Sequence, residues 1–404
     1  AVKLLSSSSV LQAQTNVRWG NITGSPSPWY HENSNWVGGI APNSNDVAVF
    51  DKVATYEVWW NNTTASLTPS VGGFQVSGGD VTFFANDGRN TRYLYSINGS
   101  GLRSDFSISG SNTSMTMGGL HMRSLGGGEI LDGSSLTIDG TPSQGSKLTV
   151  DGAAGFDVSG NLTIQQGAIF DNTIGSIGLA SDSTGIATVR NSGSQWNNSS
   201  ALYVGEGGTG TLNVEAGGLV NNTNGFVGFS NTATGSVTVS GNGSQWVTVG
   251  NLEVGTAGNG TLNVDAGGFV SSDTGYVGKN IFATGVVNVT GSGSQWDNAS
   301  ALYVGYVGEG TLIIEDGGVV SNSTGFISRT NNALGSVVVR GGGTQWNNSS
   351  DLFVGHTGNG TLTIEDGGAV SNVRGIIADV GDAISIWWRN QKNHYSTKIT
   401  THIT

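Results

Sequence analysis

The sequence predicts an all-β protein built as a parallel β-solenoid, and three observations carry this prediction. Glycine accounts for 67 of the 404 residues without the strict three-residue period of collagen. Only 11% of the residues are charged, which excludes a charge-driven disordered chain or a coiled coil. Much of the chain repeats short alternating apolar segments between Gly, Asn and Ser turns. One such segment cannot bury its own apolar face, so the repeats must stack.

The repeat has a period of 50 residues and aligns without gaps. The motif Gly-Ser-Gln-Trp or Gly-Thr-Gln-Trp ends at Trp196, Trp246, Trp296 and Trp346. Each copy is followed by Leu-x-Val-Gly and then by Gly-Thr-Leu-x-[Val/Ile]. Residues 212–220 also resemble residues 237–246, so each half of the unit is one coil of ~25 residues. A β-propeller is the competing interpretation because its blades have a similar length. The half-repeat favours the solenoid.

Five regions follow one another along the chain. We expect an N-terminal extended arm (1–28), a Trp-rich capping segment (29–65), irregular solenoid coils (66–150), the regular repeat (151–383) and a C-terminal cap or connector tail (384–404). All five Pro precede residue 143. Proline cannot donate to a sheet, so its absence from the repeat fits strands paired on both sides. Twelve or thirteen coils at ~4.8 Å each would form a rod on the order of 60 Å long.

The repeat unit resembles a known family. Leu-x-Val-Gly, Gly-Thr-Leu-x-Val-x-x-Gly-Gly and Gly-Ser-Gln-Trp together are similar to the repeat of type V autotransporter passengers and PEP-CTERM-type bacterial surface proteins. The segment Asn35-Trp36-Val37-Gly38-Gly39, with Pro42 and Asp46-Val47-Ala48-Val49-Phe50, resembles the opening of such passengers. The resemblance implies a right-handed β-helix with an extracellular, bacterial cell-surface location. The chain shows neither the C-terminal barrel nor the apolar sorting tail of that family, so we expect a removed anchor or a released chain.

The repeated Trp residues have two interpretations. Val220, Val270, Val320 and Val370 fall at the equivalent place in the intervening coils. The first interpretation is an interior column in which large and small side chains alternate. The second is an exposed aromatic ramp for sugars, which would leave apolar surface in water. We favour the interior column.

The sequence singles out no residue as catalytic. A column of acids, Glu215, Asp265, Glu315 and Glu365, recurs every second coil, too far apart for the carboxylate pair of a retaining glycosidase. The five His show no metal-ligand spacing, and no nucleophile elbow or P-loop occurs. We therefore expect neither an enzyme nor a cofactor or metal site. Several Asn-x-Ser/Thr sequons, such as those at Asn198 and Asn348, fit turns at least as well as glycosylation.

Charge is distributed unevenly and bears on partners. The segments 1–31 and 384–404 hold five basic residues and no acid, which leaves 11 basic residues against all 28 acids in 32–383 and a net charge there of −17. This balance argues against nucleic acid, which requires a concentrated basic face. No apolar run is long enough to span a membrane as a helix.

The two basic ends are the candidate assembly segments. Their residues of interest are Lys3, Arg18, Trp387, Trp388, Arg389, Lys392 and Lys398. One interpretation is a cap over the open strand edges of a solenoid. The other is a connector that adds a strand to a neighbouring copy and meets its opposite charge. The leading hypothesis is a non-catalytic secreted subunit of an extracellular filament or surface matrix, assembling head to tail. A monomeric adhesin that binds surface glycans is the alternative, and a β-helix polysaccharide lyase or glycosidase is a third.

Overall fold

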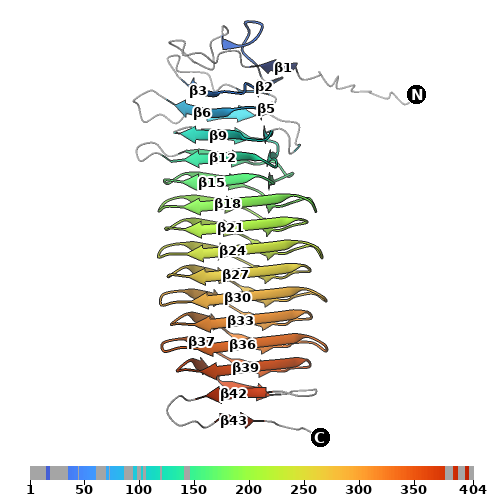
Figure 1. The fold of residues 1–404 in the computed structure, drawn as a ribbon, viewed down its shortest axis with the longest axis vertical. Coiled ribbons are helices and arrows are strands. Elements are labelled where there is room, and N and C mark those ends of the chain that lie inside the picture. The colour runs from blue at the N-terminus through green and yellow to red at the C-terminus, as the bar shows by residue number, and fades with distance from the viewer. Residues whose placement is uncertain are drawn as a thin grey trace, which may run out of the picture.

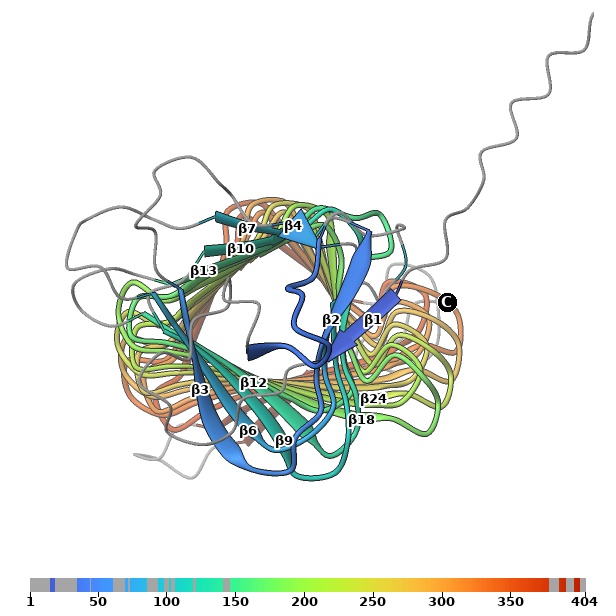
Figure 2. The same cartoon turned by 90° about the horizontal axis from the view of Figure 1, so that it is seen from above.

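The protein is a stack of β-coils around one core. A computed structural model describes residues 15–18, 35–43, 45–60, 70–71, 73–85, 94–97, 102, 106–118, 121–140, 146–377, 385–389 and 396–399. These residues form three long sheets and no α-helix. The coils lie one above the other along the long axis (Figure 1), and the three sheets surround the core (Figure 2). The prediction of an all-β parallel solenoid is confirmed, and the propeller is excluded.

The first strand of each coil belongs to sheet 1, the second to sheet 2 and the third to sheet 3. Sheet 1 has 15 strands: β1 (Thr15–Arg18), β2 (Asp46–Phe50), β5 (Gly73–Val76), β8 (Phe106–Ile108), β11 (Gly128–Ile130), β14 (Phe156–Val158), β17 (Gly175–Ile177), β20 (Ala201–Val204), β23 (Asn224–Val227), β26 (Asn251–Val254), β29 (Thr274–Val277), β32 (Ala301–Val304), β35 (Thr324–Ile327), β38 (Asp351–Val354) and β41 (Arg374–Ile377).

Sheet 2 also has 15 strands: β3 (Thr55–Trp60), β6 (Asp80–Ala85), β9 (Thr113–Gly118), β12 (Ser134–Asp139), β15 (Asn161–Gln165), β18 (Thr184–Arg190), β21 (Thr209–Glu215), β24 (Thr234–Ser240), β27 (Asn259–Asp265), β30 (Thr284–Thr290), β33 (Glu309–Glu315), β36 (Leu334–Arg340), β39 (Asn359–Glu365), β42 (Ser385–Arg389) and β43 (Ser396–Ile399). All neighbours in this sheet are parallel except β42 and β43, which are antiparallel.

Sheet 3 has 13 strands: β4 (Ser70–Val71), β7 (Leu94–Ile97), β10 (His121–Ser124), β13 (Lys147–Val150), β16 (Ile169–Asn172), β19 (Gln195–Asn198), β22 (Leu219–Asn222), β25 (Gln245–Thr248), β28 (Phe269–Ser272), β31 (Gln295–Asn298), β34 (Val319–Asn322), β37 (Gln345–Asn348) and β40 (Ala369–Ser371). Among the described residues, no helix is long and apolar enough to cross a membrane.

Each 50-residue repeat contains two coils, as the half-repeat predicted. Strand β21 pairs in parallel with β24, and its Leu212 lies opposite Val237. Inward and outward residues alternate along these strands, because successive side chains point to opposite faces. The apolar period of two in the sequence therefore determines which residues enter the core.

The turn after Leu-x-Val-Gly requires glycine. Gly255 has φ +73°, a conformation that L side chains rarely adopt, and an added Cβ would lie 2.4 Å from the carbonyl oxygen of Thr284 on the next coil. The backbone of one coil thus approaches the next too closely for a side chain at this corner. The repeated glycines keep the coils in contact at the turns.

Aromatic side chains fill the N-terminal part of the core. Trp36 is 2% exposed and packs edge-on against Phe50, with 5.5 Å between ring centroids. The rings of Phe74 and Phe106 stack at 5.8 Å, and Phe170 stacks on Trp196 at 5.9 Å. A continuous apolar interior therefore joins the irregular coils to the regular ones.

Candidate functional site

The repeated Trp residues lie inside the solenoid. All four side chains are completely buried, and in sheet 3 each lies in register with a valine of the next coil. Trp246, for example, lies between Val220 and Val270. Large and small side chains alternate along this column, so these indoles cannot form a ramp on the surface.

An Asn column accompanies the buried Trp residues. Asn198 and Asn348 are each 4% exposed, and their amides take part in hydrogen bonds within the core. Asn322 donates to Oδ1 of Asn348 at 2.7 Å and accepts from the indole of Trp346 at 2.7 Å. The sequons at Asn198 and Asn348 thus have structural side chains that a glycan could not reach without opening the coil.

A second aromatic column, which the sequence analysis missed, lies on the outer face of sheet 1. The half-buried rings of Tyr303 and Phe326 stack 4.8 Å apart at 10°, and Phe326 stacks on Phe353 at 4.8 Å and 6°. The same outward position holds Tyr203, Phe226, Tyr276, Tyr303, Phe326 and Phe353. The sequence does show these aromatic residues at two repeated positions. One is the variable residue of Leu-x-Val-Gly, such as Tyr303, and the other follows the first glycine of the intervening coil, such as Phe326 after Gly325.

Turn residues cover the outer aromatic column. Phe229, Tyr306 and His356 each meet two stacked rings at steep angles, between 60° and 90°. Burial raises the pKa of Tyr303 above its ordinary value of 10.0, although the nearby Arg329 lowers it. Since the ring faces lie against one another, the column presents ring edges to solvent. This arrangement favours cohesion between coils over stacking with a sugar.

Glu253 interrupts the outer aromatic column. It occupies the register position between Phe226 and Tyr276, and its side chain is 3% exposed. Its Oε1 pairs with the ammonium of Lys279, which also lies 4.9 Å from the centroid of the Tyr276 ring. Neither Oε2 of Glu253 nor Oγ1 of Thr256 has a hydrogen-bond partner. A buried carboxylate that is only half satisfied weakens the column at this coil.

The predicted acid column lies at the ends of strands in sheet 2. Its acids alternate with other residue types: Glu215 lies opposite Ser240, and Ser240 lies opposite Asp265. Glu315 accepts a hydrogen bond of 2.7 Å from Arg340. Carboxylates of this column are therefore two coils apart, ~10 Å, with polar partners between them.

The described part of the chain contains no cluster of side chains suited to bind a metal ion. No group of three or more His, Asp or Glu side chains is placed to hold an ion among those residues. Of the five His, His356 alone has a described side chain, and Arg329 lies 3.0 Å from its Nδ1. That side chain belongs to the outer aromatic column.

The terminal segments, where described, pair within the chain. Strand β1 pairs with β2, and Arg18 forms an ion pair with Asp51. Strand β42, which contains Trp387, Trp388 and Arg389, pairs with β39, and β43, which contains Lys398, pairs with β42. Lys3 and Lys392 lie outside the described residues. The described terminal strands thus extend sheets 1 and 2 of the same chain.

The last described coil leaves its interior partly open. Ile364, Val370 and Ile377 are only half-buried, whereas the residues 50 positions earlier, Ile314, Val320 and Ile327, are fully buried. Sheets 1 and 3 end at β41 and β40 among the described strands, and only sheet 2 continues into β42 and β43. This C-terminal face combines apolar side chains with two strand edges.

The comparisons with known proteins assign no family. The chain matches no family model, no curated protein and no solved structure at a significant level.

Proposed function

We propose that this protein is a non-catalytic structural subunit of a bacterial extracellular filament or surface matrix that assembles end to end. The observation that supports this proposal is the C-terminal face, where Ile364, Val370 and Ile377 are only half-buried. A coil from the next subunit would bury these side chains as the interior coils bury Ile314, Val320 and Ile327.

Two strand edges add to the support. Strands β40 and β41 each have one described neighbour in their sheets, whereas the strands in the middle of these sheets have two. An edge strand of a parallel sheet is a template for a further strand from another chain. Because the contact would join two different faces of the subunit, it would extend into a fibre rather than close into a ring.

Charge favours the same arrangement. The segment 32–383 carries −17, while Arg389 and Lys398 lie in the two terminal strands of sheet 2. A basic end opposite an acidic rod would attract it at low ionic strength and less strongly at high salt. Since β42 and β43 pair within the chain, the proposed contact is made by the edges of sheets 1 and 3.

The geometry gives less support to the two alternative functions, a sugar-binding adhesin and a polysaccharide-cleaving enzyme. An adhesin that stacks sugars on the repeated indoles would need Trp196, Trp246, Trp296 and Trp346 at the surface, and they are buried. A retaining glycosidase would need two carboxylates about 5 Å apart, and those of the acid column are separated by a coil.

Electron microscopy of the full chain at low and high salt tests the proposal. We expect filaments that loosen at high salt and that shorten in Val373→Lys, because Val373 is 73% exposed beside the C-terminal face. The matched control is Val249→Lys, in which an equally exposed valine (74%) lies in the middle of the rod and filaments should persist. Single short rods at both salt concentrations, or equal effects of the two substitutions, would overturn end-to-end assembly.

A further inference from the structure

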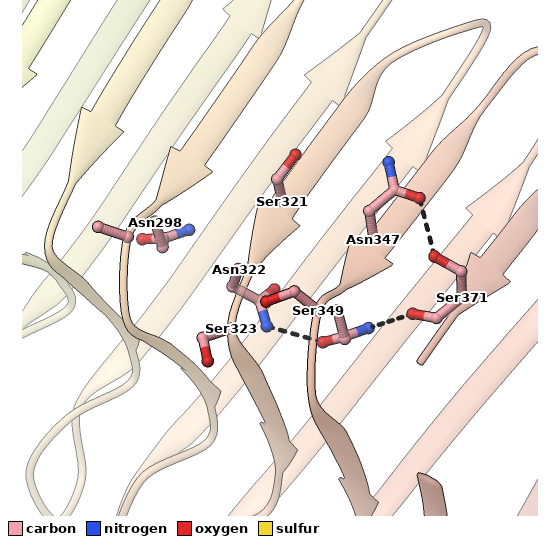
Figure 3. Close-up of a pocket in the computed structure, with 9 residues that line it drawn as sticks. Asn298, Ser321, Asn322, Ser323, Asn347, Ser349 and Ser371 are labelled. Atoms are coloured by element: carbon pink, nitrogen blue, oxygen red, sulfur yellow. Dashed lines mark hydrogen bonds between the residues drawn. The ribbon is translucent and has the colours of Figure 1, made fainter. Parts of the chain in front are cut away.

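A polar notch opens at the corner between sheets 3 and 1 near the C-terminal end. It has a volume of about 360 Å³, and Figure 3 shows its side chains converging from neighbouring coils. The lining residues are Asn298, Ala299, Ser321, Asn322, Ser323, Asn347, Asn348, Ser349 and Ser371. Every lining side chain except the methyl of Ala299 carries an amide or a hydroxyl, and none carries a charge.

The amides of the notch are held in place by one another. Asn348 accepts from Asn322 at 2.7 Å and donates to the backbone oxygen of Ser371 at 3.2 Å. The hydroxyl of Ser371 donates to Oδ1 of Asn347 at 3.0 Å (Figure 3). These bonds join three neighbouring coils. The floor of the notch is therefore ordered before any ligand arrives, which lowers the entropy cost of binding.

Three hydroxyls of the notch remain available. Within the described part of the chain, the side chains of Ser321, Ser323 and Ser349 make no hydrogen bond. A serine hydroxyl offers one donor and two acceptor positions. The notch thus presents unpaired donors and acceptors above a rigid polar floor.

The equivalent corners of earlier coils are closed by their own side chains. Two repeats before Ser323 and Ser321, Thr223 donates to the backbone oxygen of Ser199 at 3.0 Å, and Asn221 donates to Asn197 at 2.7 Å. At the corner between, Asp273 accepts from Ser300 at 2.8 Å. Among the described residues, Ser323 makes no side-chain hydrogen bond, whereas Thr223 and Asp273 at the equivalent positions each make one, and this difference sets the corner apart from its repeats.

We propose that the notch binds a neutral oligosaccharide. Neutral sugars present many hydroxyls that both donate and accept, as the amides and hydroxyls of the notch do. An acidic glycan would meet a rod whose segment 32–383 carries −17 and no cation in the notch to offset it. The volume fits a small ligand or a short stretch of a polymer. Through Ser371 of β40 the notch borders the C-terminal face, but binding of a sugar in it does not require end-to-end assembly.

The proposal is tested by giving the notch the side chains of the corner two repeats earlier, which bond within the chain. The double variant Ser321→Asn, Ser323→Thr reproduces Asn221 and Thr223, which bond within the chain. Calorimetric titration with hexasaccharides of β-1,4-linked glucose and N-acetylglucosamine should show binding to the wild-type chain and at least about tenfold weaker binding to the double variant. An oligogalacturonate serves as the acidic probe and should not bind.

Ser271→Asn is the matched control, because Ser271 occupies the position equivalent to Ser321 one repeat earlier. It should leave the affinity unchanged, and circular dichroism should show that both variants keep the β-solenoid. The proposal would be overturned if neither neutral probe binds, if the double variant binds with the same affinity as the wild-type chain, or if the oligogalacturonate binds more tightly than the neutral probes.

Discussion

The indole Nε1 of Trp246 donates a hydrogen bond of 2.6 Å to Oδ1 of Asn222 on the preceding coil. The same bond joins Trp196 to Asn172 and Trp346 to Asn322. Each indole in these coils is thereby satisfied while fully buried, as a buried N–H requires. Trp296 is the exception, because Ser272 stands where the others have Asn, and its Nε1 has no partner.

This exception predicts that Ser272→Asn stabilises the protein. The new amide would accept from Trp296 and donate to Asn298, whose Oδ1 now accepts from the Ser272 hydroxyl. We expect a gain of about 1–3 kcal/mol in the free energy of unfolding, measured by urea denaturation, because a buried unpaired donor is costly. The reverse change, Asn222→Ser, should lose a similar amount. Unchanged stability in both variants would contradict the importance of this bond.

The glycine that faces each Trp gives a second prediction. A Cβ on Gly275 would lie 2.8 Å from Cζ2 of Trp296 and 2.9 Å from Cδ1 of Leu302, too close for either. Gly275→Ala should therefore destabilise the protein by about 1–3 kcal/mol through overpacking. Thermal unfolding followed by circular dichroism measures the effect.

Gly375 supplies the matched control for that substitution. It occupies the same repeat position, but among the described residues no Trp lies beside it, and the nearest atom to an added Cβ is Nδ2 of Asn372 at 3.4 Å. Gly375→Ala should change stability by less than about 0.5 kcal/mol. Equal losses at Gly275 and Gly375 would show that glycine is needed for the backbone rather than to make room for the indole.

The break in the outer aromatic column gives a third prediction. Glu253→Tyr places an aromatic ring between Phe226 and Tyr276, as Tyr203 and Tyr303 are placed one repeat away on either side. We expect a gain of about 0.5–1.5 kcal/mol from the new ring contacts, together with removal of the unpaired Oε2. Chemical denaturation measures it, with Tyr303→Glu as the opposite change. A less stable Glu253→Tyr variant would indicate that the ion pair with Lys279 contributes more than the stack.

The ion pair of the last two coils gives a prediction about pH. A hydrogen bond from Arg374 holds the pKa of Asp351 below its ordinary value of 3.8. A carboxyl with a lowered pKa stabilises the folded state above its unfolded pKa, and this contribution is lost as the pH falls through the folded pKa. We therefore expect the pairing of β38 with β41 to loosen below about pH 3.8, with lower protection factors for amide hydrogen exchange in β41.

Substitution of the arginine tests the cause of that shift. In Arg374→Gln, NMR titration should show the pKa of Asp351 rising toward 3.8. Arg340→Gln, which removes a different pair on sheet 2, should leave the pKa of Asp351 unchanged. A low pKa that persists in Arg374→Gln would assign the shift to another group.

Much of the interior could be predicted from the sequence, because a period of two within strands and of ~25 residues between coils determines what enters the core. The alternation of Trp246 with Val220 and Val270 followed from that spacing alone. The outer column could not be predicted in this way, because Tyr303 and Phe326 occupy outward positions, which the alternating pattern assigns to solvent.

What the sequence by itself determined is the solenoid, its two coils per repeat and its inward-facing residues, since apolar periodicity is a local property of the chain. The tertiary structure alone decided which polar groups are satisfied and which remain open. Trp296 lacks its partner because of one side chain 24 residues away, and Ser323 lies in an open notch because its neighbours on two other coils are short. Such pairings depend on how coils stack, and the physical reason is that a hydrogen bond forms only at close range between groups whose separation along the chain is long.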